Sequence, residues 1–97
     1  MILIYVTCKD NKEAKKISKY LLDKKLIVCA NIFPIESLYY WKGKLTEDKE
    51  VVLILKALKN NYKKIKEEIK KIHSYDIPFI GKINIEVNKE YKKWSKK

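Results

Sequence analysis

The sequence contains no arginine, although it is strongly basic. All 23 of its basic residues are lysines, against 12 acidic residues, which gives a formal net charge of +11. Arginine supplies the bidentate contacts that recognise bases and phosphates, whereas lysine acts as a hydrated point charge. The lysines are also spread over expected helix faces instead of gathering between aromatic side chains. We therefore favour a solvated basic surface over nucleic-acid binding.

Loop-forming and metal-binding residue types are scarce as well. Two glycines and two prolines in 97 residues leave little material for loops, so most of the chain should be regular structure. The two cysteines and one histidine form no CxxC pair and no histidine-rich tract, which excludes the usual zinc signatures. Cys8 and Cys29 fall inside expected strands, where we interpret them as small buried hydrophobic residues in a reducing compartment.

Catalytic and membrane signals are also lacking. No nucleophile–base pair, phosphate-binding glycine loop or paired-carboxylate motif stands out, so we expect no enzymatic activity. The first ten residues, MILIYVTCKD, carry one short apolar run without a basic leader, which is typical of neither a signal peptide nor a membrane span. A chain of 97 residues has room for one core. We expect one domain over residues 1–97, a cytoplasmic location and no membrane partner.

The strongest structural pattern in the sequence is a pair of strand-like runs over residues 26–58. Both runs are rich in Ile, Val, Tyr and Phe and flank the short turn Lys42-Gly43, which predicts a β-hairpin. Each arm of about fifteen residues would be ~50 Å long, whereas a domain of this size has a radius of gyration of ~13 Å. The far end of the hairpin should therefore be covered by other subunits. Pro34 predicts a bulge, a bend or a change of pairing partner, and the charged residues 47–49 predict a kink.

Outside the hairpin, hydrophobic periodicity predicts two further strands and three helices. Asp10 and Glu13 form a capping-box pattern for the first helix, and Asn60 or Asn61 is expected to cap the second. The expected strands cover residues 2–7 and 80–87, and the helices cover residues 11–24, a segment ending near residue 73 and a short segment from residue 88.

The order of these elements predicts an α+β fold, the ferredoxin-like βαββαβ sandwich. In this fold two helices pack on one face of an antiparallel sheet. The opposite face would be bare, and a bare face of Val, Leu and Ile calls for burial in a closed assembly. We prefer a threefold assembly, although periodicity alone does not set the number.

Segments along nearly the whole chain resemble the CutA family of divalent-cation tolerance proteins, in the same order. They are residues 29–32, 37–41, 43–44, 49–51, 54–56, 73–78 and 91–94. The resemblance implies a ferredoxin-like homotrimer similar in architecture to PII-type signal proteins. It also implies a role in tolerance of copper and other divalent metal ions, with copper binding and without an established catalytic reaction.

The sequence departs from the family pattern at two places that concern copper. A family cysteine linked to copper precedes the threonine of the first strand, and Val6 stands there in this chain. The bacterial His-His pair is reduced to Ile72 and His73, and Ser74 replaces the proline that follows. A copper site implied by the resemblance is therefore depleted, and His73 is its one direct match.

His73 is the only histidine and lies at the C-terminus of the second expected helix. The helix dipole favours a cation there, so we interpret His73 either as a capping or core residue or as a metal ligand. Cys29 or Asp76 would assist it as a ligand if the fold brings them near. Thiolate with imidazole suits copper or zinc better than magnesium. One histidine and one buried thiol do not complete a site, so we expect weak binding or ligands shared between subunits.

Aromatic side chains are concentrated at the end of the first hairpin arm. Tyr39, Tyr40 and Trp41 are consecutive, and such residues bury large areas at interfaces while keeping a polar tip. We interpret this block either as trimer packing or as a surface for ligand stacking. Alternatively, Lys56 can line a cleft between subunits for a small anionic ligand, together with Tyr40, Trp41 and Tyr75.

Acidic residues are concentrated on the return arm. Glu47, Asp48 and Glu50 are interpreted either as solvated charges or as hard oxygen ligands for a divalent ion. Glu50 immediately precedes an apolar strand, so its carboxylate should be paired, and Lys56 of the same or a neighbouring chain is a candidate partner. The expected inter-subunit cleft is thus lined by Tyr40, Trp41, Glu50, Lys56 and Tyr75.

Two functional hypotheses follow from these patterns. The first is a non-catalytic homotrimer of the CutA type that binds and confers tolerance to copper or another divalent metal ion. The alternative is a PII-like signalling or ligand-sensing trimer that binds a small anion in its inter-subunit clefts. Retention of Cu(II) favours the first hypothesis, and an organic ligand in the cleft favours the second.

Overall fold

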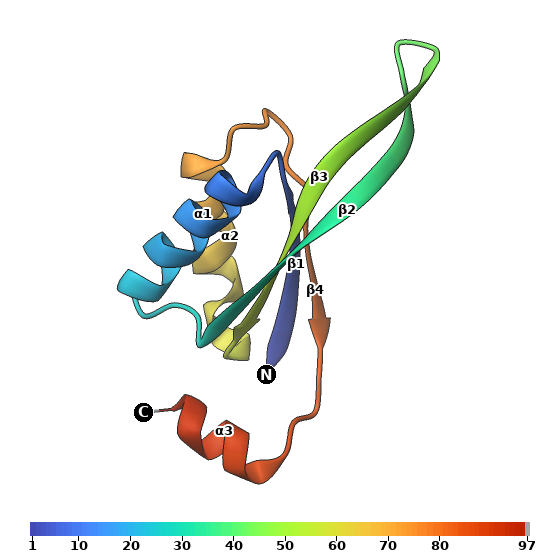
Figure 1. Ribbon diagram of the computed structural model, residues 1–97. Coiled ribbons are helices and arrows are strands. Elements are labelled where there is room, and N and C mark those ends of the chain that lie inside the picture. The colour runs from blue at the N-terminus through green and yellow to red at the C-terminus, as the bar shows by residue number, and fades with distance from the viewer. Residues whose placement is uncertain (97) are drawn as a thin grey trace.

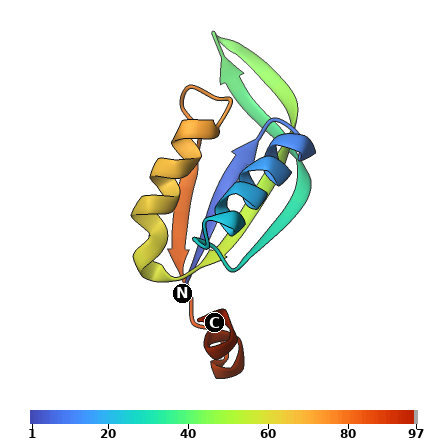
Figure 2. The ribbon, with the colours of Figure 1, turned by 90° about the vertical axis from the view of Figure 1, so that its left-hand side faces the viewer.

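The sheet and its helices follow the expected order. The computed structural model describes residues 1–96. The elements are β1 (Ile2–Cys8), α1 (Asn11–Asp23), β2 (Cys29–Trp41), β3 (Lys44–Ala57), the 3-10 helix η1 (Lys59–Asn61), α2 (Tyr62–Ile72), β4 (Ile80–Asn84) and α3 (Lys89–Ser95). The strands form one sheet in the order β2-β3-β1-β4, all antiparallel. Helices α1 and α2 lie side by side on one face of it (Figure 1 and Figure 2). This arrangement confirms the ferredoxin-like α+β fold.

Strand β1 is at the centre of the sheet because it pairs with both β3 and β4. Its side chains alternate between the two faces, and Ile2, Ile4, Val6 and Cys8 are fully buried beneath the helices. The helices and β3 complete this core with Ala14, Ile17, Leu21, Val51, Leu53, Leu55, Ala57, Ile65 and Ile69. The three-and-four spacing of the apolar positions on each helix therefore does mark the buried stripe.

Both helix starts differ in detail from the expectation. Asp10 caps α1 by accepting from the backbone N–H of Glu13 at 2.8 Å, but the Glu13 carboxylate bonds the N–H of Lys9 at 3.0 Å instead of that of Asp10. The side chain of Asn61 makes no cap at all. Its amide donates to the carbonyl oxygen of Leu26 at 3.2 Å, so it ties the start of α2 to the loop before β2.

Strand β4 is shorter than expected. Alternation predicted a strand to residue 87, but pairing ends with Ile2 opposite Asn84. One further bond, from the N–H of Ile85 to the carbonyl oxygen of Met1, closes the ladder at 3.1 Å. The sequence pattern continues, but β1 offers no further residues to pair with. The short terminal helix α3 follows as expected and lies beyond the N-terminal end of β1 (Figure 1).

Strands β2 and β3 form the predicted hairpin, a twisted two-stranded arm (Figure 1). The register runs unbroken from Cys29 opposite Lys56 to Trp41 opposite Lys44. The expected bulge or change of partner at Pro34 is therefore wrong, because β2 is an edge strand, where a residue without an N–H is tolerated. Pairing also continues through residues 47–49.

The arm extends beyond the helical body, as its length predicted. The chain measures 48 × 25 × 21 Å, with a radius of gyration of 14.3 Å. Large hydrophobic side chains are exposed on the arm and on the sheet face opposite the helices; they include Tyr5, Phe33, Leu38, Tyr39, Tyr40, Trp41, Leu45, Phe79 and Ile83. Within residues 1–96, no helix combines the length and the apolar character needed to cross a membrane.

Candidate functional site

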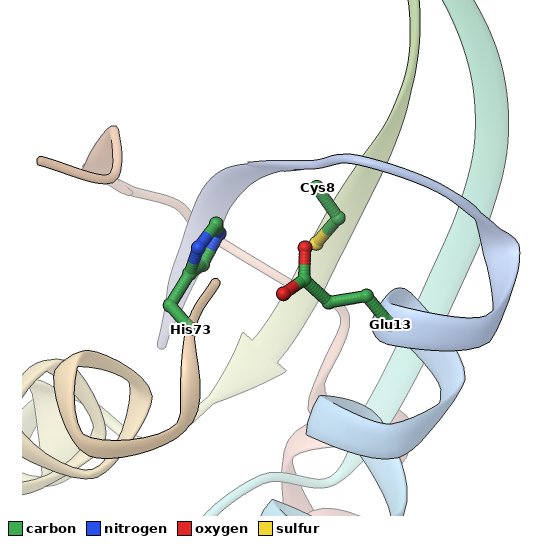
Figure 3. A group of neighbouring side chains, drawn as sticks. All are labelled: Cys8, Glu13 and His73. Carbon is green, nitrogen blue, oxygen red and sulfur yellow. The ribbon is translucent and has the colours of Figure 1, made fainter. Parts of the chain in front are cut away.

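Three side chains of metal-binding type meet at one end of the core: Cys8, Glu13 and His73 (Figure 3). One potential ligand atom from each lies within 4.8 Å of the others. Cys8 ends β1, Glu13 lies in the first turn of α1, and His73 directly follows α2. Sequence reasoning singled out His73 but missed its two neighbours. For Glu13 the sequence offered the capping-box spacing, which indicated a helix cap, and for Cys8 it offered no signal of this cluster.

The carboxylate of Glu13 is buried and already bonded at both oxygens. Oε1 accepts from the backbone N–H of Lys9 at 3.0 Å, and Oε2 accepts from that of Ser74 at 2.8 Å. Burial alone would raise the pKa of Glu13, but the hydrogen bonds from Lys9 and Ser74 together outweigh it and hold the pKa below its ordinary value. Glu13 is therefore an anion that satisfies two backbone donors.

Both ring nitrogens of His73 are also engaged. Nε2 lies 2.8 Å from the carbonyl oxygen of Thr7, which can only accept, and Nδ1 lies 3.0 Å from the backbone N–H of Tyr75, which can only donate. These partners define the neutral tautomer with its proton on Nε2. A metal ion would need the lone pair on Nδ1, and that lone pair already accepts from Tyr75.

Cys8 completes the cluster as a neutral thiol. Its side chain is fully buried, and this burial, with a smaller effect from the Glu13 charge, raises the pKa of Cys8 to about 12. The thiolate is the form that binds metals. A protonated thiol, an occupied imidazole and a satisfied carboxylate do not fit copper or another divalent ion. The geometry therefore argues against the ligand role expected for His73.

The other two expected ligands lie elsewhere. Cys29 pairs with Lys56 on β3, whereas Cys8 pairs with Val51. Five positions along a strand correspond to roughly 17 Å, so one chain does not bring Cys29 to His73. Asp76 follows His73 closely in sequence but belongs to the lining of a neighbouring cleft. Both cysteines are free thiols.

This cleft, of about 760 Å³, lies between the arm and the segment that follows α2. It is lined by Thr7, Tyr39, Trp41, Asp48, Glu50, Tyr75, Asp76, Ile77 and Phe79. Of the five residues expected in a cleft, the structure brings three together, Trp41, Glu50 and Tyr75.

Tyr40 and Lys56 do not line this cleft. Tyr40 is 76% exposed between its two lining neighbours, because successive side chains of a strand point to opposite faces. Lys56 lies at the opposite end of β3, with its Nζ 5.6 Å from the centre of the Tyr91 ring.

Two tyrosine hydroxyls hold two of the cleft carboxylates. Tyr75 donates to Oε2 of Glu50 at 2.6 Å, and Tyr39 donates to Oδ2 of Asp48. Burial first, and then the bond to Glu50, raises the pKa of Tyr75. The prediction that Glu50 is paired is confirmed, and its partner within one chain is Tyr75, not Lys56 of the same chain.

The cleft is acidic, in a chain that is otherwise basic. Among residues 1–96, its lining contains Asp48, Glu50 and Asp76 but no lysine. All ion pairs within residues 1–96 involve Glu68, which does not line the cleft. The Nζ atoms of Lys24, Lys64 and Lys71 lie 3.6, 3.4 and 2.8 Å from its carboxylate oxygens. The electrostatics of the cleft favour a cation over an anion.

These features define a small α+β protein of the PII-like class. They are a ferredoxin-like sheet with a projecting arm, an acidic aromatic cleft at the base of that arm, and a closed Cys-Glu-His cluster beside the cleft. A profile of the CutA1 divalent ion tolerance protein family matches residues 2–97. The chain belongs to this family.

Individual relatives agree with this assignment. The divalent-cation tolerance protein CutA of Thermococcus kodakarensis is 43% identical over 94 residues, which cover 96% of this chain and 90% of the relative. The crystal structure of CutA1 from Pyrococcus horikoshii superposes with a TM-score of 0.93 at 43% identity, covering 97% of this chain and 93% of the other. A periplasmic divalent cation tolerance protein CutA from Archaeoglobus fulgidus reaches 0.93 at 40% identity, covering 99% and 96%.

Proposed function

We propose that this protein is a non-catalytic homotrimer that binds copper and other divalent metal ions through the carboxylates of the acidic cleft. One observation carries the proposal. In a chain with 23 lysines, the cleft gathers Asp48, Glu50 and Asp76 without a lysine in its lining within residues 1–96. Membership of a divalent-cation tolerance family supports the same class of ligand.

The arrangement of the carboxylates accounts for the class and the strength of binding. Tyr39 and Tyr75 each bond one oxygen of Asp48 and Glu50, respectively, and so orient these groups while their second oxygens remain available. Copper(II) binds a given nitrogen or oxygen site more tightly than the other divalent first-row ions. The cleft carboxylates do not form a close group of the kind seen at His73 within residues 1–96, so water has to complete the coordination and binding is weak.

The homotrimer is supported by the surface that one chain leaves uncovered. The arm ends in Trp41, which is 61% exposed, and the sheet face opposite the helices exposes Tyr5, Phe33 and Ile83. Exposed apolar areas of this extent mark interaction surfaces, and closed rotational symmetry lets each arm lie on the next copy. The number three follows from the family resemblance. Such an assembly would also bring a neighbouring chain to the open side of the cleft.

Binding of a small anion is not favoured by the same observations. Lys56, the cation expected for an anionic ligand, lies beside Tyr91 and away from the cleft. Three carboxylates would repel an anion from the site that remains.

Titration calorimetry with Cu(II) and with Mn(II) tests the proposal on the intact assembly. Glu50→Gln and Asp76→Asn should each weaken binding several-fold, because each removes a charged oxygen ligand. Glu47→Gln is the matched control, since Glu47 is on the same arm outside the cleft lining. Equal affinities in all four proteins would refute the cleft as the metal site. Sedimentation should give a mass of about 35 kDa, three times the chain mass of 11.6 kDa, and a monomer would refute the assembly.

A further inference from the structure

We propose that the Cys8–Glu13–His73 cluster is a positioning device that fixes one wall of the acidic cleft and holds no metal ion itself. Three consecutive residues after α2 are held by hydrogen bonds, two of them directly to the start of the chain and the third to the ring of His73. The ring of His73 bonds Thr7, the backbone N–H of Ser74 bonds Glu13, and the backbone N–H of Tyr75 returns to the ring of His73. A segment held at three successive residues has little freedom to move.

The anchors of this segment belong to the central strand and to the first helix. Thr7 is in the central strand β1, and Glu13 is in α1, where the Asp10 cap fixes the first turn. Glu13 spans 61 residues of sequence to reach Ser74. Cys8 is fully buried at the same end of β1, and its sulfur faces the Glu13 carboxylate (Figure 3). The hydrogen bonds of the cluster thus fix an exposed loop to elements of the core.

The effect of this anchoring reaches the cleft through Tyr75. The Tyr75 ring packs on the His73 ring, with their centres 4.9 Å apart, and its hydroxyl donates to Glu50 at 2.6 Å. Asp76 follows directly and lines the same cleft. A hydrogen-bonded path therefore runs from Glu13 and His73 to the carboxylates, and His73 acts on the cleft through Tyr75. The expected effect of His73 on metal binding rests on the proposed function.

Two substitutions at one position separate positioning from ligation. His73→Ala removes both bonds of the ring. His73→Asn keeps an acceptor oxygen near the place of Nδ1, so it can still bond the N–H of Tyr75, but an amide is a poor substitute for imidazole as a copper ligand. Lys70→Ala, an exposed change in the last turn of α2, is the control for unrelated effects near the helix end.

Hydrogen exchange measured on the peptide that covers residues 73–79 is the first readout, made without metal. The amide of Tyr75 should exchange at least about fivefold faster in His73→Ala, because one protecting hydrogen bond is lost. Exchange in His73→Asn and Lys70→Ala should stay within about twofold of wild type. An unchanged rate in His73→Ala, or equally fast exchange in His73→Asn, would overturn the positioning role.

Calorimetry with Cu(II) is the second readout. Affinity should fall several-fold in His73→Ala and be restored in His73→Asn. Equal losses in both variants would identify His73 as a ligand and overturn the inference. If wild type does not bind Cu(II) or Mn(II) at all, the proposed function fails, while the exchange rates still decide whether the cluster positions the loop.

Discussion

Removal of the Glu13 carboxylate should show how strongly the buried cluster stabilises the fold. In Glu13→Ala, the backbone N–H groups of Lys9 and Ser74 lose their acceptors, which now lie at 3.0 and 2.8 Å. Hydrogen bonds to charged groups contribute about 1.5–3 kcal/mol each. Because Ser74 is exposed, water can replace part of its bond, and we expect a total loss of about 2–4 kcal/mol in the free energy of unfolding. Glu13→Gln keeps one acceptor oxygen and should lose about half as much.

Guanidinium unfolding at a fixed protein concentration measures these losses. The matched control is Glu67→Gln, an exposed acid on α2, which should stay within about 0.5 kcal/mol of wild type. The pKa of Glu13 is lowered by folding, so its contribution is present above the ordinary value of 4.5 and is lost as the pH falls below it. The gap between wild type and Glu13→Gln should therefore narrow in acid. A loss below about 0.5 kcal/mol in Glu13→Ala, or a gap independent of pH, would refute this reasoning.

Three further predictions test the core, the thiol and the arm. Burial raises the pKa of Cys8 from 9.0 to about 12, so the wild-type protein should lose stability as the pH rises between these values. Thermal denaturation of Cys8→Ala should lack this part of the loss, and identical alkaline stability profiles of the two proteins would contradict the prediction. Ile69→Ala, in the fully buried stripe of α2, should lower the free energy of unfolding by about 2–5 kcal/mol, and a decrease below about 1 kcal/mol would mean that the site is not close-packed. Trp41→Ala should shift sedimentation at micromolar concentration toward smaller species, whereas an unchanged assembly would rule out a packing role for Trp41.

Local chemistry was sufficient to predict the elements of this fold. Alternating β-branched and aromatic residues on both sides of Lys42-Gly43 specify a hairpin, and both turn residues adopt the positive φ that a two-residue turn requires, 51° and 78°. Element ends were harder to predict, since they depend on partners. Residues 80–87 alternate throughout, but the strand stops where β1 has no residue left to pair with.

The candidate site was only partly predictable, because its residues come together through the tertiary fold. His73 drew attention as the single histidine, yet Cys8 and Cys29 both follow a short apolar run, residues 2–6 and 26–28, and look alike in the sequence. Only the strand register decides that Cys8 reaches the cluster and Cys29 does not. Glu13 followed a capping pattern, and nothing in the sequence signals its bond to Ser74, 61 residues away.

The central place of β1 has a consequence for how this protein is made. Residues 2–8 leave the ribosome well before one of their two partner strands, β4, which begins at Ile80. At about 5–20 residues per second, the nascent strand waits several seconds for that partner. Its apolar side chains are unprotected during that interval, so the growing chain should depend on chaperones more than the finished protein does.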